Sequence, residues 1–345
     1  MSRLPMLGVV LALAATLAEA APIFTDTFTN GSTLFGSSVP GGTPTSSFTS
    51  YQLASGGRNA AVSSFVSTVS GSALRLTWSA AGSSNLAEGG AVFTTTPVTL
   101  AAPGDAINIR YTFTNTANVL SGAMSGSNSA IGVGLFNSNG SLPLTGTALA
   151  NNGMSATNGA LAAGGVQGWT GYVGTIPING SSGNLYTRAA QTGTASNNQS
   201  LARFGSSANY ANPAAATIGS SRVSTVLLAT GSQYTFDYTL TLLASGSLQA
   251  TQQLFAGVGT GGTQLYTQSG TASGANLLTT TFDGLSFGMR AVTASGSTAA
   301  IPQMDINSIS VTATVVPEPT STVAIVSSVG MAALMLRRRR ARQAE

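Results

Sequence analysis

The sequence predicts an all-β protein built as a two-sheet antiparallel β-sandwich, and three observations lead to this prediction. Long segments alternate apolar and polar residues with a period of two, as strands with one buried and one solvated face require. Between residues 22 and 316 the apolar residues show almost no helical period. Thr, Val, Tyr and Phe, which favour strands, fill the alternating segments, whereas Gly, Ser and Asn fill the gaps.

Four segments show the alternation most clearly. Their apolar positions are Tyr234, Phe236, Tyr238, Leu240 and Leu242; Ile107, Ile109, Tyr111 and Phe113; Leu74, Leu76 and Trp78; and Leu285, Phe287 and Met289. We expect these side chains to meet in one core between two sheets. Shorter candidate strands cover residues 23–29, 91–100, 130–136, 171–178, 223–229, 248–257, 264–268, 277–282 and 306–315. The Gly-, Ser-, Ala- and Asn-rich segments 151–168 and 179–221 are predicted to be surface loops.

The order of these segments resembles the concanavalin A-like jelly roll of lectins and glucanases. The resemblance rests on an early Asp26-Thr27-Phe28 strand, long alternating central strands and a closing strand over residues 304–315. Glucanases of this fold that use a Glu-x-Asp-x-x-Glu strand have no counterpart here, because Glu88 is the only Glu between residues 22 and 316.

Composition excludes several classes of site. The 345-residue chain has no Cys and no His, and all 13 of its basic residues are Arg. A disulfide framework, a zinc site of the usual kind and a His-dependent nucleophile are therefore excluded. Residues 22–316 carry seven Arg and six acidic residues, so this part is almost neutral and offers no basic face for nucleic acid. We predict no cofactor and no metal site.

The N-terminus is typical of a secretory signal peptide. Arg3 supplies a positive charge, residues 7–17 are apolar, and Ala18-Glu19-Ala20 forms an A-x-A cleavage site. The apolar run is shorter than the roughly 20 residues that span a bilayer, which favours cleavage over a retained anchor. We assign residues 1–21 to a signal helix that signal peptidase removes.

The C-terminus combines Pro317-Glu318-Pro319, an apolar segment over residues 323–336, and Arg337, Arg338, Arg339, Arg340 and Arg342. An apolar helix followed by Arg is an anchor whose positive end faces the cytoplasm. Residues 317–345 resemble the PEP-CTERM sorting signal of Gram-negative bacteria. This resemblance implies a membrane-anchored precursor that an exosortase cleaves near the Pro-Glu-Pro motif, and a mature protein at the cell surface or in the extracellular matrix.

For residues 22–316, a single domain, we expect a non-enzymatic role associated with exopolysaccharide. No pair of acidic residues has a spacing typical of glycan hydrolysis, so no catalytic residue is predicted. The first alternative is a lectin-like carbohydrate-binding module, and the second is a carboxylate-based glycan hydrolase or lyase.

Two groups of residues are candidates for carbohydrate contact. Trp169 and Tyr172 lie in a Gly-rich segment, where an exposed ring could stack on a sugar; the alternative is a Trp folded back over the sandwich edge. Arg110, Asp237 and Arg290 occupy the polar phases of their strands. They predict either a cross-strand ion pair or a sugar-binding groove on the outer face of a sheet.

Both terminal segments generate a prediction about processing. The exported protein should lack residues 1 to about 20 and the C-terminal Arg cluster. Intact mass spectrometry of the surface-associated protein measures this directly. A surface form that retains Arg337–Arg340 would contradict cleavage of the sorting signal.

Overall fold

The computed structural model describes residues 21–28, 52–57, 66–69, 73–77, 85–117, 130–141, 165–178, 182–190, 201, 217–223, 226–291 and 303–315. The predicted signal and sorting segments, with Ala18, Ala20, Pro317, Glu318, Pro319 and Arg337–Arg340, lie outside these ranges, as does Trp78. Within the described residues, no helix has the length and apolar character needed to cross a bilayer.

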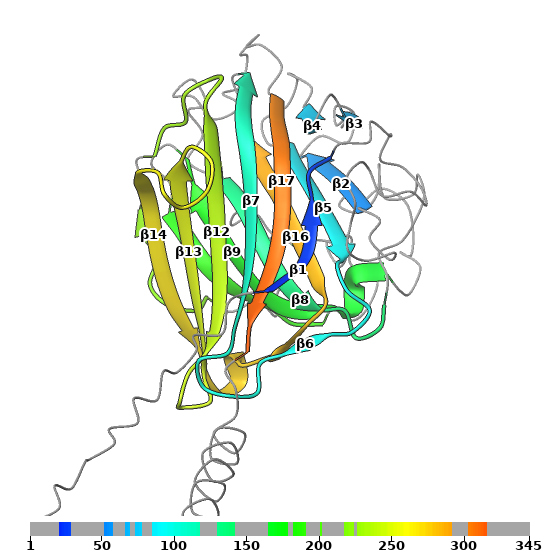
Figure 1. The fold of residues 1–345 in the computed structure, drawn as a ribbon, viewed down its shortest axis with the longest axis vertical. Coiled ribbons are helices and arrows are strands. Elements are labelled where there is room, and N and C mark those ends of the chain that lie inside the picture. The colour runs from blue at the N-terminus through cyan, green and yellow to red at the C-terminus, as the bar shows by residue number, and fades with distance from the viewer. Residues whose placement is uncertain are drawn as a thin grey trace, which may run out of the picture.

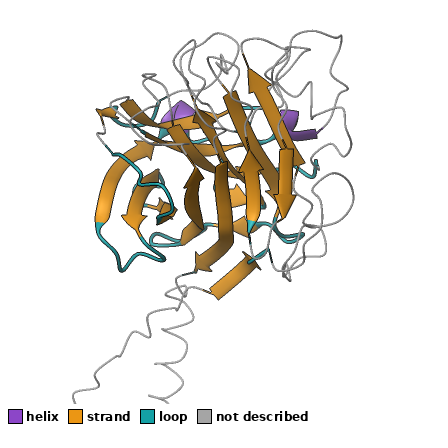
Figure 2. Cartoon of the chain, turned by 90° about the horizontal axis from the view of Figure 1, so that it is seen from above, coloured by secondary structure: helices purple, strands orange, loops and turns teal. Residues whose placement is uncertain are grey.

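The described chain forms two antiparallel sheets that pack face to face, as predicted (Figures 1 and 2). Sheet A, nearer the viewer in Figure 1, runs in the order β14 (Gln264–Ala272), β13 (Leu248–Ala256), β12 (Gln233–Leu242), β7 (Ala106–Ala117), β17 (Gln303–Thr314), β4 (Leu74–Thr77) and β3 (Val66–Val69), and β1 (Ala21–Asp26) also pairs with β17.

Sheet B lies behind sheet A and contains seven strands among the described residues. Its order is β11 (Arg222–Val223), β10 (Ser182–Arg188), β9 (Thr170–Pro177), β8 (Ala130–Asn137), β16 (Gly284–Ala291), β5 (Asn85–Val92) and β2 (Gln52–Gly57). A short pair of strands, β15 (Thr281–Phe282) and β6 (Val98–Thr99), and two 3₁₀ helices, η1 (Gly165–Gly168) and η2 (Gly274–Asn276), complete the described structure.

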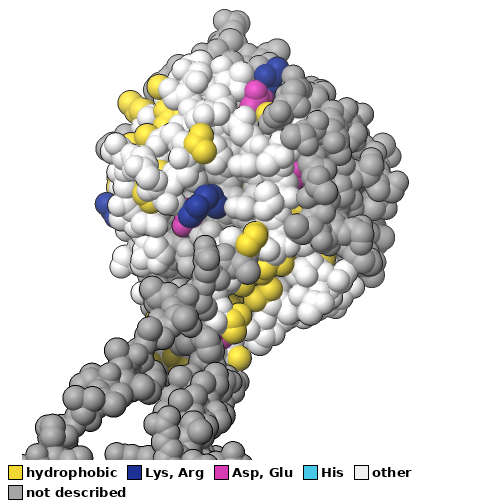
Figure 3. All heavy atoms as spheres, viewed as in Figure 1, with side chains coloured by type: hydrophobic (Ala, Val, Ile, Leu, Met, Phe, Trp, Pro, Cys, Tyr) yellow, Lys and Arg dark blue, Asp and Glu magenta, His cyan; other side chains and the backbone are white. Residues whose placement is uncertain are grey.

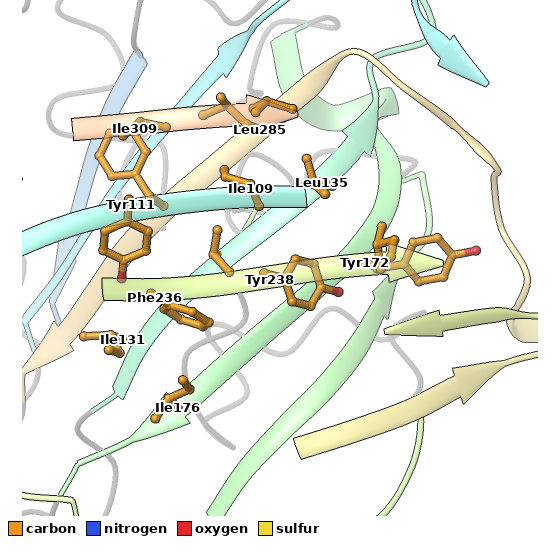
Figure 4. Close-up of a cluster of buried hydrophobic side chains, with 14 of the residues drawn as sticks. Ile109, Tyr111, Ile131, Leu135, Tyr172, Ile176, Phe236, Tyr238, Leu285 and Ile309 are labelled. Carbon is orange, nitrogen blue, oxygen red and sulfur yellow. The ribbon is translucent and has the colours of Figure 1, made fainter. Parts of the chain in front are cut away.

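The main core fills the space between the two sheets. Tyr234, Phe236, Tyr238, Ile107, Ile109 and Phe113, the residues predicted to share a core, are all buried in it. Figure 4 shows side chains of β7 and β12 facing Ile131, Leu135, Tyr172 and Ile176 of sheet B. The prediction of a shared core is therefore confirmed: the six residues lie on β7 and β12 of sheet A, and they share one core with apolar side chains of β8 and β9 in sheet B.

Sheet B is also covered on its other face. Val92, Phe136 and Val173 lie on its strands, and Val166, Trp169 and Leu201 pack against them in a second buried cluster. Sheet B is therefore buried on both sides here, which explains why its strands carry Gly at positions where a side chain would collide. A Cβ atom on Gly284 would lie 2.7 Å from Cζ3 of Trp169.

Four sequence predictions about local structure were wrong. Residues 223–229 and 277–282 were predicted to be strands, but the described residues form strands there only at Arg222–Val223 (β11) and Thr281–Phe282 (β15). Residues 179–221 were predicted to be a loop, but β10 occupies Ser182–Arg188 and pairs with β9 from Asn184 to Arg188. Its period-two pattern is hidden in the sequence because Gly183 and Thr187 share the buried phase with Leu185. Residues 91–100 were predicted to be one strand, but β5 ends at Val92 and the chain turns before β6 begins at Val98.

Several tyrosine hydroxyls lie in this interior. Burial raises the pKa of Tyr111 and Tyr238 well above the ordinary tyrosine value, and the neighbouring Tyr172 raises that of Tyr238 further. Burial also raises the pKa of Tyr266 to about 12, although the positive charge of Arg222 acts in the opposite direction. Neither Tyr111 Oη nor Tyr238 Oη has a hydrogen-bond partner within the described part of the chain.

The raised pKa values of these buried tyrosines predict that the folded state loses stability at alkaline pH. An unfolded tyrosine ionises near pH 10, so above about pH 10 the unfolded state releases protons that the folded state retains. The stability that depends on neutral buried phenols is complete below about pH 10 and falls as the pH rises toward 12 and beyond. Denaturant unfolding from about pH 8 to about pH 12, followed together with tyrosinate absorbance, measures this fall.

Tyr238→Phe provides the control. The change removes one raised ionisation, so the fall in stability with pH should become shallower, while stability at neutral pH changes little because no hydrogen bond is lost. Ionisation of all tyrosines near pH 10 with the fold intact would contradict the buried arrangement.

Candidate functional site

The outer face of sheet A is a continuous polar surface, which we call the polar face. The alternation that buries the apolar residues of β7, β12, β13, β14 and β17 turns their polar residues outward. The polar face comprises Asn108, Arg110, Thr112, Thr114, Thr235, Asp237, Thr239, Thr241, Gln249, Thr251, Gln253, Thr267, Ser269, Thr271, Ser308, Ser310, Thr312 and Thr314. Among these, Thr112, Thr235 and Asp237 are buried, and the others are partly or fully exposed. In Figure 3 the central part of this side is mostly white, hydrophobic side chains gather toward its upper left and in a band at the lower right of centre, and basic and acidic groups lie side by side near the centre and at the top.

Arg110 and Asp237 form an ion pair near the centre of the polar face. They lie directly opposite each other on β7 and β12, and Arg110 Nε donates to Asp237 Oδ1 at 2.6 Å. Asn108 Nδ2 donates to the other carboxylate oxygen at 3.0 Å, so both oxygens of Asp237 are engaged. The structure thus contains the predicted cross-strand pair between Asp237 and an Arg.

The guanidinium of Arg110 is only partly used by this pair. Its Nε is fixed by Asp237, whereas no hydrogen bond from its two Nη groups to another described residue is present. The Arg110 side chain is 38% exposed and that of Asp237 is 9% exposed. The carboxylate therefore orients the guanidinium, and the outer Nη groups remain available as donors toward solvent.

A second ion pair lies farther along β17. Arg75 Nε and Nη2 donate to the two oxygens of Asp305, each at 2.7 Å, so this pair is bidentate. The hydrogen bond from Arg75 to Asp305 raises the pKa of Arg75, with a smaller charge–charge contribution, while burial opposes the shift. Unlike Arg110, Arg75 directs two of its three nitrogens at its carboxylate.

Hydroxyl groups on neighbouring strands of the polar face also contact one another. Thr251 Oγ1 lies 3.0 Å from Ser269 Oγ, and Thr112 Oγ1 lies 3.3 Å from Thr235 Oγ1. Asn108 Nδ2 donates to Thr239 Oγ1 at 2.8 Å. Because this oxygen accepts from the amide, the Thr239 hydroxyl proton can point away from Asn108 and toward solvent.

The other candidate residues for carbohydrate contact do not join this surface. Trp169 is fully buried, its ring lies 5.9 Å from that of Phe136, and its Nε1 donates to the Ser141 carbonyl at 3.0 Å. Tyr172 is buried in the main core and its hydroxyl donates to the Thr279 carbonyl. The hypothesis of an exposed stacking pair is therefore wrong, and the alternative of a folded-back Trp holds.

Arg290 is also separated from the polar face, because it belongs to β16 of sheet B and its side chain lies outside the described residues. A groove that combines Arg290 with Asp237 is thereby excluded. Arg110 is the basic candidate that remains beside Asp237.

Two further aspartates, Asp105 and Asp283, stabilise turns. Asp105 Oδ2 accepts the backbone N–H groups of Ala101 and Ala102, each at 2.8 Å. Asp283 accepts both the backbone N–H and the hydroxyl of Ser138, at 2.6 and 2.7 Å. Within the described ranges, no three acidic side chains gather in a group that could hold a metal ion.

A buried polar cluster was missed at the sequence level. Gln252 Nε2 donates to Gln268 Oε1 at 2.6 Å, and Tyr266 Oη donates to the same oxygen at 2.9 Å. Gln268 Nε2 in turn donates to the Ser220 carbonyl at 2.6 Å. The signal was present, since Gln252 follows Leu248 and Ala250 on the apolar phase of β13. A polar residue in that phase indicates an internal hydrogen-bond partner.

Comparisons with known proteins add three similar solved structures. An endo-1,3-β-glucanase from Streptomyces sioyaensis is 15% identical with a TM-score of 0.40, and the match covers 86% of this chain and 97% of that one. A marine alginate lyase from Aplysia kurodai is 13% identical with a TM-score of 0.40, covering 85% and 99%. The winged bean acidic lectin, complexed with methyl-α-D-galactose, is 11% identical with a TM-score of 0.34, covering 78% and 93%. No protein-family model and no curated protein matches the chain.

These findings correct the prediction that the chain is not an enzyme, since two of the three similar structures are a glucanase and a lyase. The prediction relied on the spacing of carboxylates along the chain. A sandwich brings together residues that are far apart in sequence, as the pairing of Arg110 with Asp237 illustrates, so sequence spacing is a weak test for an active site.

The burial of Trp169 predicts a structural phenotype. Trp169→Ala should lower the free energy of unfolding by about 3–5 kcal/mol, because it removes the ring that packs against Phe136 and Gly284. Denaturant unfolding measures the loss. Val258→Ala, at an exposed apolar position, is the matched control and should change stability by less than about 0.5 kcal/mol. Equal stability of the two variants would contradict the packing role of Trp169.

Proposed function

We propose that this protein is an exported, carbohydrate-binding β-sandwich of the bacterial cell surface or extracellular matrix. The observation that carries the proposal is the polar face, on which the Arg110 guanidinium is oriented by Asp237 and has Nη donors facing solvent. Hydroxyl and amide side chains surround it, and they can both donate and accept hydrogen bonds, as sugar hydroxyls do.

The proposed location follows from the terminal segments. Signal peptidase would release residues 1–21, the C-terminal helix would hold the precursor in the inner membrane, and an exosortase would cleave near Pro317-Glu318-Pro319. The strand limits support this processing, because β1 begins at Ala21 and β17 ends at Thr314. Release of residues 1–21 would remove only the first residue of β1, so the rest of β1 and the whole of β17 would remain after both cleavages. The ligand in this setting would be an exopolysaccharide.

Arg110→Ala tests the proposal. Affinity for the bound glycan should fall by at least about tenfold, because hydrogen bonds from charged groups contribute roughly 1.5–3 kcal/mol. Loss of the ion pair should also lower stability, by about 1–3 kcal/mol, because the buried Asp237 would keep only the Asn108 amide as a donor. Binding of the mature protein to a panel of neutral and acidic polysaccharides provides the reference affinity, and release of new sugar ends in the same incubations reports any cleavage.

Arg75→Ala is the matched control, because it also removes an Arg–Asp pair from sheet A. The bidentate Arg75 has less donor capacity left for a ligand, so this variant should retain glycan affinity. An equal loss in both variants would indicate a general structural effect. Absence of saturable binding to every polysaccharide would contradict the proposed function.

A further inference from the structure

Two rows of side chains cross the centre of the polar face perpendicular to its strands. In strand order from β14 to β17, the first row is Thr267, Gln253, Asp237, Arg110 and Ser310, and the second is Ser269, Thr251, Thr239, Asn108 and Thr312. Neighbouring members of a row are about 4.7–4.9 Å apart, the spacing of strands in a sheet. We call these the two central rows.

The two central rows carry no net charge. Arg110 and Asp237 are their only ionisable members, and these neutralise each other at 2.6 Å. Arg75 and Asp305, elsewhere on sheet A, are likewise paired. Within the two central rows an anionic polymer would therefore meet no unbalanced positive charge, because the charge of Arg110 is already neutralised by Asp237. The exposed Arg222, which donates to the Thr267 carbonyl at the β14 end of the first row, lies outside these rows on β11.

The groups that remain are hydroxyls, amides and the outer guanidinium nitrogens. Thr239 and Thr251 lie opposite each other at the middle of the second row, and both are partly exposed. The Thr239 oxygen accepts from Asn108, and the Thr251 hydroxyl contacts Ser269. Each hydroxyl is thus held by one internal contact and keeps hydrogen-bonding capacity for a partner in solvent.

We propose that the two central rows bind an uncharged polysaccharide that lies extended across the strands. This inference rests on the proposed function and specifies its ligand class and its site. A regular series of hydroxyl and amide groups, repeated from strand to strand, complements a polymer that presents hydroxyls at every sugar unit. Recognition occurs through hydrogen bonds, since Trp169 and Tyr172, the rings considered for stacking, are buried elsewhere.

The test is the double variant Thr239→Val, Thr251→Val of the mature exported protein. Valine keeps the branched shape that suits a strand and removes only the hydroxyls. The probes are a soluble uncharged β-glucan and the polyuronate alginate, each titrated at low and high NaCl. The wild-type protein should bind the glucan with little salt dependence, and the double variant should bind it at least about tenfold more weakly.

Thr99→Val is the matched control. Thr99 Oγ1 lies 3.1 Å from Thr281 Oγ1, so this change also breaks a cross-strand hydroxyl contact, but in the β6–β15 pair away from the polar face. Its glucan affinity should equal that of the wild type. Thr239→Ser, Thr251→Ser should restore most of the affinity, which separates loss of hydroxyls from misfolding of the Val variant.

The outcomes distinguish the inference from the proposed function. Binding of alginate alone, lost at high NaCl, would overturn the uncharged ligand class and leave carbohydrate binding intact. Equal glucan affinity of the double variant and Thr99→Val would overturn the site. Failure of the wild-type protein to bind either polymer would overturn the inference, and failure across the wider panel would overturn the proposed function as well.

Discussion

The register between β7 and β12 is the constraint on which the rest of the structure depends. These central strands pair from Gln233 with Thr114 to Thr241 with Ala106, without interruption. Because side chains alternate between the two faces, this register sends Ile109 and Tyr238 into the core and Arg110 and Asp237 outward. A slip of one residue would bury the ion pair and expose the aromatic rings. The core and the polar face are thus two consequences of the same pairing.

Sheet B differs from sheet A because buried side chains pack against both of its faces in the described structure. Rings approach its backbone closely: a Cβ on Gly134 would lie 2.4 Å from Cζ of Phe136, and one on Gly171 would lie 2.7 Å from Cδ1 of the same ring. Glycine at these positions makes room for the second cluster, in which Trp169 is enclosed. The composition of the two sheets therefore differs for a physical reason, since sheet A presents polar groups outward and sheet B accommodates packing on each side.

The sequence predicted the parts of the fold that depend on local alternation. Residues 234–242 and 107–114 were identified as strands with the correct buried phase, because period two is unambiguous over segments of that length. The strand β10 was missed, because Gly183 and Thr187 occupy its buried phase beside Leu185 and no apolar alternation appears in the sequence. Whether Trp169 is exposed or buried could not be predicted from its neighbouring glycines, because glycines occur both beside exposed side chains and where packing is close. The packing of Trp169 against strands of sheet B decides between these alternatives.

The site was predictable to a similar degree. The polar phases of Arg110 and Asp237 could be recognised in the sequence, but their adjacency depends on strand order, which places β7 beside β12 and β16 in the other sheet. Arg290 was grouped with them because phase alone does not identify the sheet. The contribution of Asn108, which occupies the second oxygen of Asp237, also appears only when the register is known.

Few residues of this protein are charged, and the aspartates named above are bound by arginines or by backbone N–H groups, so they leave little unbalanced charge. Asp237 and Asp305 are paired with arginines, while Asp105 and Asp283 accept backbone N–H groups at turns. The proposed glycan-binding surface must therefore rely on neutral donors and acceptors, whose hydrogen bonds depend on direction as well as on distance. The antiparallel strands of sheet A supply that geometry, because they repeat hydroxyl groups at a fixed spacing. Threonine suits both requirements, since its branched side chain favours strands and its hydroxyl group carries no charge.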